Sequence, residues 1–597
     1  MRLRFTILLF LISFQPLLGQ ETFPVNGVAE KFEPIHAFIN AHIILSPTNE
    51  IDRGVLLIQS NRIIAVDTNL NIPNGAIIHD LNGDFIYPSF IDLYTDYGLP
   101  KAKKIKSNYR PQYESNKTGA YHWNEAIRPE INAKNEFAND KQAANNYLKN
   151  GFGTVLTHIQ DGIFRGTGCL VLLSKKSEQE NIILPQGASF FSFKKGISKQ
   201  KNPSSLMGSI ALIRQTFLDA EWYHTQKNQT NLSYSAINNQ QELPHIFTIN
   251  DELDYSRVYK ISDEFEIDFI IKGNGKEYSR IKEVTNTNFP VIIPLNFPDS
   301  YDISNPETAS WISLNQLKHW ETAPYNAAIL AKNEVEFCIT SSGIDKDSNF
   351  ITNLQLTVKK GLSKQDALAA LTTTPANLIG IDTEIGTLED GKIANFFIAS
   401  KDIFEDGKIY ENWTAGEQHI ITKKQNIDIR GYYTLNADNF ENKLVSIEGS
   451  KTKPKTIINA LDSISLTTIL EQNNINISTE NGKFRASGKF KNERITGRYQ
   501  DSLGLYHTFN MQRDSLFKED KKEFTLTIDS ILPSVWFPNK SHGFIQLPQT
   551  ENIIFRNATV WTNEKEGILK NMDVAIKDGK IIAIGKDLNE LEIFPET

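Results

Sequence analysis

Two stretches at opposite ends of the chain repeat one strand pattern, and this repeat constrains the fold more than any other feature. Residues 38–45, beginning Phe38-Ile-Asn-Ala, resemble residues 555–562, beginning Phe555-Arg-Asn-Ala, 517 positions later. Residues 54–66 likewise resemble residues 573–585. Each copy predicts two or three short strands, and such a repeat indicates two similar units in tandem.

The tight turns inside the two copies support this interpretation. Ser60-Asn61 occupies the turn of the first copy, and Asp578-Gly579 occupies that of the second. Asp-Gly between β-rich runs is a strong hairpin signal. The second copy begins near residue 549 and stops at Thr597, which is too short for a complete domain. We therefore expect the chain to be the front part of a longer protein.

Strand-like and helix-like runs alternate between the two copies. Strands are predicted at 85–93, 153–158, 245–249, 267–271, 290–294 and 336–340, and helices at 205–223, 311–332 and 363–371. Ser363 begins the last helix with a capping pattern. Strands that alternate with helices over about 250 residues predict an α/β fold of the TIM-barrel type. From 428 to 548, glycines and short alternating runs predict an antiparallel β-rich module.

Composition excludes some classes of protein. Hydrophobic residues make up 40% of the 597 residues and charged residues 22%, which suits a globular protein with buried cores. The net charge is −8, and no basic run is long enough to follow a phosphate backbone, so we expect no nucleic-acid partner. The densest basic stretch, 101–106, is interpreted as a solvated loop.

The first twenty residues read as a secretory signal peptide. Arg2 and Arg4 precede an apolar run at 5–14, and the small residue Gly19 follows. The run is too short to span a bilayer, so we expect a periplasmic or extracellular protein without a membrane anchor after cleavage. Cys169 and Cys338 each lie in an apolar run, which favours buried free thiols, although a disulfide remains possible.

Residues 83–98 and 361–398 carry a family resemblance. They resemble the two ends of an amidohydrolase-superfamily domain, closest to the imidazolonepropionase-like group, and the resemblance restarts at 552. It implies a small β-sandwich formed by residues 36–84 and 380–427. The residues between these segments, 85–379, would form a barrel that holds one or two metal ions. By the same resemblance, residues 549–597 begin a second amidohydrolase-like unit.

The positions that match the family's metal ligands hold unsuitable residues. The family's first strand ends in two histidines at i and i+2, which point the same way and can share one metal; here Tyr94 and Asp96 match them. The ends of two middle strands match near Asn250 and Lys272, and the family's catalytic Asp matches Ser342. Because a zinc site needs about three protein ligands, we expect no metal in this barrel, and zinc or another divalent ion in the family's active units.

The resemblance implies an exported hydrolase that attacks C–N bonds with metal-activated water. The bond would belong to an amide, a cyclic amide or a peptide-like small molecule, and the first barrel would be a non-catalytic scaffold for the protein's own C-terminal second unit. Two alternatives stay open. One is a non-enzymatic binding protein for a peptide, glycan or partner. The other is an active first barrel with an atypical site around Asp96.

A few further residues are candidates for the rim of a pocket. His158 follows a predicted strand, close in sequence to Asp161 and Arg165. A long loop carries a dense polar and aromatic group, and another predicted rim segment contains a tryptophan. The candidate rim residues are His122, Trp123, Arg128, His158 and Trp320.

Overall fold

A computed structural model describes residues 33–102, 113–225, 228–344, 350–424 and 427–588, without 439, 451–452, 459–463, 472, 480–483, 502 and 518–551. The predicted signal peptide at 1–20 lies outside the described residues. Within the described ranges, no helix combines the length and the apolar composition needed to cross a membrane.

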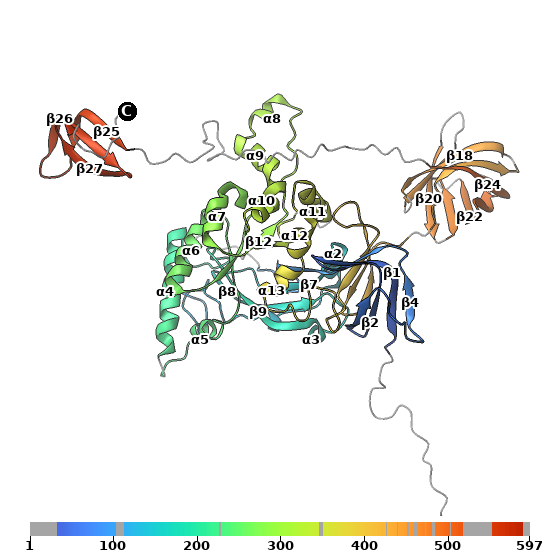
Figure 1. Cartoon of the computed structure of the whole chain (residues 1–597), viewed down its shortest axis with the longest axis horizontal. Coiled ribbons are helices and arrows are strands. Elements are labelled where there is room, and N and C mark those ends of the chain that lie inside the picture. The colour runs from blue at the N-terminus through green and yellow to red at the C-terminus, as the bar shows by residue number, and fades with distance from the viewer. Residues whose placement is uncertain are drawn as a thin grey trace, which may run out of the picture.

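The first sheet joins strands from both ends of the first unit (Figure 1). Its order is β16-β15-β14-β5-β1-β2-β3, and β4 also pairs with β1. The rings of Phe38, Phe396 and Trp413 pack against one another in its core. The strands are β1 (Ile35–Ser46), β2 (Asn49–Gln59), β3 (Arg62–Asp67), β4 (Ile77–Asp80), β5 (Phe85–Pro88), β14 (Phe396–Ala399), β15 (Ile409–Thr414) and β16 (Glu417–Ile420).

The second sheet is the predicted TIM-type barrel, and the predicted fold class is confirmed. Its order is the reverse of the chain order, from β13 back to β6. One strand departs from the pattern, because β8 runs antiparallel to both β7 and β9. The strands are β6 (Phe90–Thr95), β7 (Phe152–Thr157), β8 (Phe164–Leu172), β9 (Ile182–Ser192), β10 (His245–Thr248), β11 (Phe269–Lys272), β12 (Val291–Pro294) and β13 (Phe337–Thr340).

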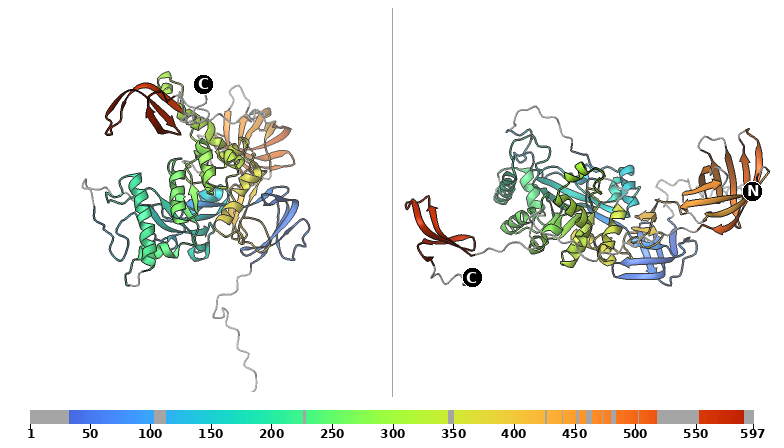
Figure 2. Two further views of the ribbon diagram at one scale, coloured as in Figure 1. Left: turned by 60° about the vertical axis from the view of Figure 1, so that its left-hand side comes forward. Right: turned by 90° about the horizontal axis from the view of Figure 1, so that it is seen from above.

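Alternate residues of these strands face the barrel interior and the surrounding helices, as a strand period of two requires. Ile246 and Ile270 belong to the interior cluster, whereas Phe247 and Ile271 pack in the cluster between the sheet and the helices. The helices lie outside the sheet (Figures 1 and 2). Cys169 and Cys338 are both buried free thiols, as their apolar surroundings predict.

The three helices predicted from the sequence are present, and one of them is divided. The predicted helix at 311–332 is divided into α9, η3 and α10, because Pro324 cannot donate a backbone hydrogen bond. Ser363 caps α12 as predicted, and its side chain accepts from the backbone N–H of Asp366. The helices are η1 (Ala133–Asn135), α2 (Lys141–Lys149), α3 (Glu178–Asn181), α4 (Leu206–His224), α5 (Leu232–Asn239), α6 (Asp254–Phe265), η2 (Glu277–Arg280), α7 (Ile281–Thr287), α8 (Pro306–Ser310), α9 (Leu314–Thr322), η3 (Ala323–Tyr325), α10 (Asn326–Lys332), α11 (Phe350–Lys359), α12 (Lys364–Ala369) and α13 (Thr373–Leu378).

The predicted antiparallel β-rich module is a closed barrel of eight strands. Each strand pairs antiparallel with the next, and β17 pairs with β24 to close the ring. The strands are β17 (Gly431–Ala437), β18 (Phe440–Ser450), β19 (Lys453–Ile458), β20 (Ile464–Glu471), β21 (Asn474–Ser478), β22 (Arg485–Lys491), β23 (Arg494–Gln500) and β24 (Tyr506–Leu516).

The sequence repeat is also a repeat of backbone geometry. The second copy forms a three-stranded sheet of β25 (Ile553–Trp561), β26 (Ile568–Lys577) and β27 (Lys580–Gly585). The first two strands of each copy show a register shift at matching positions, 38–41 and 555–558. Three pairs of matching non-glycine residues have positive φ, namely Asn40 and Asn557, Arg53 and Asn571, and Ser60 and Asp578. Because L-residues rarely adopt this conformation, the two copies share one backbone design.

Asn412 joins the sandwich sheet to the barrel, and its replacement tests that junction. Its side-chain amide donates to the carbonyl oxygens of Leu148 and Phe152 at 3.1 and 3.0 Å, and its oxygen accepts from Ser89 Oγ at 3.0 Å. Asn412→Ala leaves these buried groups unsatisfied, so we expect the free energy of unfolding to fall by roughly 2–4 kcal/mol. Urea denaturation followed by tryptophan fluorescence measures it. Exposed Asn377→Ala is the control. An equal loss of unfolding free energy in both variants would contradict the role of Asn412 in joining the sheet to the barrel.

Candidate functional site

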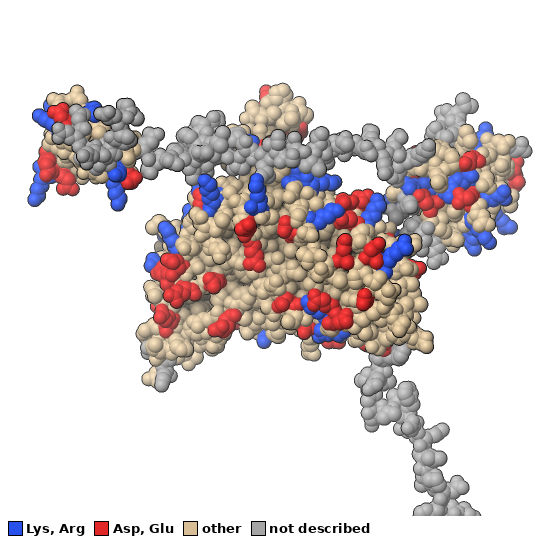
Figure 3. All heavy atoms as spheres, in the orientation of Figure 1, with Lys and Arg blue, Asp and Glu red and all other residues tan. Residues whose placement is uncertain are grey.

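The face of the barrel unit seen in Figure 3 carries acidic and basic side chains in small mixed groups. Two positively charged side chains of this unit, Arg165 and Lys272, are buried at the carboxyl ends of the barrel strands. Tyr94 on β6, Thr248 on β10 and Lys272 on β11 meet there, together with His158 after β7. The structure thus brings together three of the residues singled out in the sequence, Tyr94, Lys272 and His158.

Arg165 is the fifth member of this cluster, and its place follows from the direction of β8. Because β8 runs antiparallel to its neighbours, its first residues lie where the other strands end. Arg165 Nη1 donates to Tyr94 Oη at 3.0 Å and to Thr248 Oγ1 at 3.3 Å, and its Nε donates to the carbonyl of Gly162 at 3.1 Å. The side chain is therefore held by three elements, and only 6% of the residue is exposed.

Lys272 places a second positive charge beside the same tyrosine. Its Nζ lies 5.3 Å from the centroid of the Tyr94 ring and donates to the carbonyl of Gly273 at 2.7 Å. Burial lowers the pKa of Lys272 to about 8, and the nearby carboxylates of Glu277 and Asp92 oppose that shift. Near neutral pH the ammonium therefore remains mostly protonated.

Asp92 forms hydrogen bonds between the first and the last strands of the barrel, β6 and β13. Its carboxylate accepts from the backbone N–H and the hydroxyl of Ser341 at 2.8 and 2.7 Å, and from the backbone N–H of Tyr94 at 3.0 Å. Burial raises the pKa of Asp92, while hydrogen bonds from Thr340 and Ser341 act in the opposite direction. Its oxygens are thus committed to joining β6 to the end of β13.

His158 is an apolar packing element in this cluster. Its ring stacks on Phe190, with centroids 3.5 Å apart, and meets Tyr94 edge-on at 4.7 Å. Neither ring nitrogen has a hydrogen-bond partner among the described residues. Burial and the charge of Arg165 hold the pKa of His158 well below its usual value, so the imidazole is neutral.

The other predicted ligand positions border two separate cavities. Asp96 and Ser342 line a cavity of about 410 Å³, which Tyr94 also borders. Asn250 borders a separate cavity of about 880 Å³ between the segments that follow β9 and β10. The backbone N–H of Asn250 donates to Asp254 at 3.1 Å. The positions that would share one metal in the family are therefore divided here among three places.

Comparisons with known proteins agree on one family. The profile described as "Amidohydrolase family" matches residues 327–427. The solved amidohydrolase from Thermotoga maritima is 20% identical, with a TM-score of 0.52, and the match covers 64% of this chain and 98% of that one. Residues 327–427 thus match the amidohydrolase family, and the barrel unit has the fold of a solved amidohydrolase.

A second solved structure, a β-aspartyl dipeptidase from Fervidobacterium islandicum in complex with a β-Asp-Leu dipeptide, is 14% identical. That match covers 66% of this chain and 99% of that one, with a TM-score of 0.38. No curated protein matches the sequence. The family predicted from the sequence is confirmed for the barrel unit, while its degenerate character and the tandem arrangement stay predictions.

The residues of this amidohydrolase barrel do not fit the divalent metals that the family generally uses. Within the described ranges, no group of three or more His, Cys, Asp or Glu residues is placed to hold a metal ion. Instead, the mouth holds the guanidinium of Arg165 and the ammonium of Lys272. A divalent cation beside two buried positive charges is strongly disfavoured, because repulsion is weakly screened away from water.

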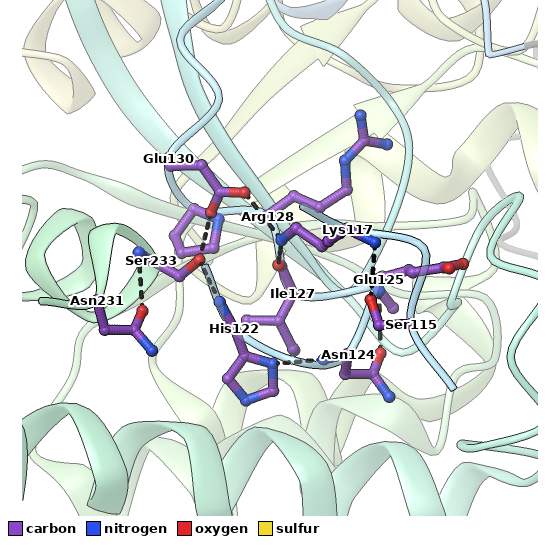
Figure 4. A network of polar contacts seen from close by, with 12 residues as sticks. Ser115, Lys117, His122, Asn124, Glu125, Ile127, Arg128, Glu130, Asn231 and Ser233 are labelled. Atoms are coloured by element: carbon purple, nitrogen blue, oxygen red, sulfur yellow. Dashed lines mark hydrogen bonds and ion pairs between the residues drawn. The ribbon is translucent and has the colours of Figure 1, made fainter. Parts of the chain in front are cut away.

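The candidate rim residue His122 is a buried anchor of its loop (Figure 4). Its backbone N–H donates to Ser233 Oγ at 3.0 Å, and its Nδ1 accepts from the backbone of Asn124 at 3.0 Å. Ser233 Oγ in turn donates to Glu130 at 2.7 Å, and Lys117 pairs with Glu130 at 2.9 Å. Burial lowers the pKa of His122 to about 4. The network fastens the long loop to α5.

The remaining rim candidates lie elsewhere on this amidohydrolase domain. Arg128 forms an ion pair with Asp161 and borders a cavity of about 540 Å³. Trp123 and Trp320 are about half exposed, on the loop and on α9 respectively. The structure does not gather these residues with the cluster around Tyr94.

Replacement of Lys272 tests the buried charge through the pH dependence of stability. The pKa of Lys272 falls from 10.5 to about 8 on folding, so between these pH values the unfolded chain binds more protons. The free energy of unfolding should therefore rise with pH across that window, by roughly 3 kcal/mol relative to Lys272→Met. Urea titrations from pH 7 to 10.5 measure it. The exposed control Lys260→Met should show the same rise in the free energy of unfolding as the unmodified chain. If the difference between the unmodified chain and Lys272→Met does not change with pH, the pKa of Lys272 is not lowered on folding.

Proposed function

We propose that this barrel is a non-catalytic amidohydrolase unit, retained as a scaffold within an exported protein that hydrolyses C–N bonds. The observation that carries the proposal is the pair of buried cations, Arg165 and Lys272, where strand ends converge. In a TIM-barrel enzyme the carboxyl ends of the strands form the active site. Here Arg165 and Lys272 occupy part of that place, and Arg165 is hydrogen-bonded to Tyr94 and Thr248.

The remaining carboxylates support the same proposal. Asp92 is fully buried and accepts three hydrogen bonds, two of which, from Ser341, join β6 to the end of β13. Asp96 is the single carboxylate among the described residues that line the cavity with Ser341 and Ser342. Because a catalytic zinc needs about three protein ligands and an open position, one free carboxylate does not suffice.

We further propose that β25–β27 begin a second amidohydrolase-like unit, which performs the hydrolysis. In the first copy, Phe38 is completely buried under Phe396 and Trp413. The matching Phe555 is 53% exposed, and Trp561 on the same strand is 76% exposed. An apolar strand face of this kind needs a cover, and closing strands like β14 and β15 would supply it.

The metal content of the chain tests the first proposal. After equilibration with zinc or manganese and removal of the free ion, the purified chain should retain much less than one metal per molecule. The physical reason is repulsion from the two buried cations. Plasma mass spectrometry measures the content, with Asp96→Asn as the matched control. One tightly held equivalent that disappears in Asp96→Asn would establish a working site around Asp96 instead.

The whole protein, purified from the cells that make it, tests whether the second unit rather than this barrel performs the hydrolysis. We expect it to hydrolyse members of a panel of dipeptides, N-acyl amino acids and cyclic amides. Asp96→Asn and Lys272→Met should leave kcat/KM within about twofold, because neither residue contacts the reacting bond. A loss above a hundredfold in Asp96→Asn, with an unchanged melting temperature, would place catalysis in this barrel. A whole protein that hydrolyses nothing on the panel would favour a binding role.

A further inference from the structure

The closed barrel β17–β24 contains a cavity of about 230 Å³. Its lining includes Ala437 at the end of β17, Ile458 at the end of β19 and Tyr499 near the end of β23. Because neighbouring strands are antiparallel, the ends of these alternate strands lie at one end of the barrel. The cavity therefore occupies one half of the interior.

Large side chains fill the other half. Tyr433, Ile475, Phe490 and Ile495 belong to the barrel core but do not border the cavity. The hydroxyl of Tyr433 donates to the carbonyl of Ile429 at 2.5 Å. The guanidinium carbon of Arg513 lies 5.0 Å from the centroid of the Phe490 ring. One end is thus packed and closed, while the other is hollow.

The hollow arises from small residues at inward-facing positions. Ala437, Ala486 and Thr456 border the cavity, where an aromatic ring would fill it as Phe490 does at the other end. An unfilled volume of this size destabilises a core, because the lining atoms lose their contacts. A bound molecule would restore those contacts.

The lining also determines what kind of molecule fits. Among the residues that the structure describes, no charged side chain borders the cavity. The hydroxyl of Thr456 is already hydrogen-bonded to that of Thr468 at 2.7 Å. A charged or strongly polar molecule would lose its hydration without compensation, so the cavity selects neutral, apolar ligands.

We propose that this barrel binds one small, neutral, apolar molecule. An apolar cavity of about 150 Å³ holds a benzene ring, so by proportion this cavity of about 230 Å³ holds on the order of ten carbon atoms. A bicyclic aromatic compound or a short acyl chain has that size. Eight-stranded barrels are wide enough to hold one small ligand. The inference is independent of the function proposed for the amidohydrolase barrel.

The methionines provide a direct test on the whole chain. The sequence has four, of which Met511 borders the cavity and Met207 is exposed on α4. With ¹³C-methyl methionine, naphthalene should shift the Met511 resonance in a saturable manner and leave that of Met207 unchanged. Testosterone, about twice as large, should not shift Met511. No saturable shift with naphthalene, or equal shifts with both compounds, would overturn the proposal.

Two variants on one strand separate the cavity from the barrel surface. Ala486→Phe adds a ring inside the cavity, whereas Ser487→Phe adds the same ring on the exposed face of β22. We expect naphthalene affinity to fall at least tenfold in Ala486→Phe and to stay within twofold in Ser487→Phe. Unchanged affinity in Ala486→Phe would place the ligand elsewhere. If Ala486→Phe does not fold, the comparison of naphthalene with testosterone on the unmodified chain decides.

Discussion

Two positive charges are buried at the mouth of the amidohydrolase barrel, and their neighbours are arranged to stabilise them. Arg165 is satisfied by two hydroxyls and a carbonyl, and Lys272 by a carbonyl and the face of Tyr94. The stabilisation of Lys272 is incomplete, since its pKa of about 8 corresponds to a cost of roughly 3 kcal/mol for the charged form. This charge arrangement disfavours a metal cation beside Arg165 and Lys272.

The same contacts hold together strands that a shared metal would otherwise connect. Arg165 links β8 to β6 and β10 through Tyr94 and Thr248. Asp92 links β6 to Ser341 at the end of β13. These two strands are the first and the last in the order of the sheet. Direct hydrogen bonds among side chains therefore connect the mouth of the barrel. Such a mouth can remain ordered without a metal, because buried hydrogen-bonded networks of side chains favour a single arrangement.

Local patterns in the sequence were sufficient for much of the fold. The alternation of strands and helices and the closing residues 361–398 predicted the barrel family, and Ser363 predicted a helix start. The direction of β8 was not predictable, because an apolar run around Cys169 reads the same in either direction. Arg165 therefore attracted notice only as a neighbour of His158, although its position on an antiparallel strand brings it to Tyr94. The burial of His122 depends on Ser233, more than a hundred residues away, a contact that no local pattern encodes.

The two copies of the repeat show why burial cannot be inferred from sequence similarity alone. Phe38 and Phe555 occupy matching places in matching sheets, with the same positive φ two residues later at Asn40 and Asn557. One ring is buried and the other is half exposed, because only the first copy has β14 and β15 beside it. Backbone design is thus local and repeats with the sequence, whereas the core of a sandwich is completed by strands more than three hundred residues away. An exposed copy of a sheet that is elsewhere buried therefore indicates which of its surfaces is apolar and needs a cover.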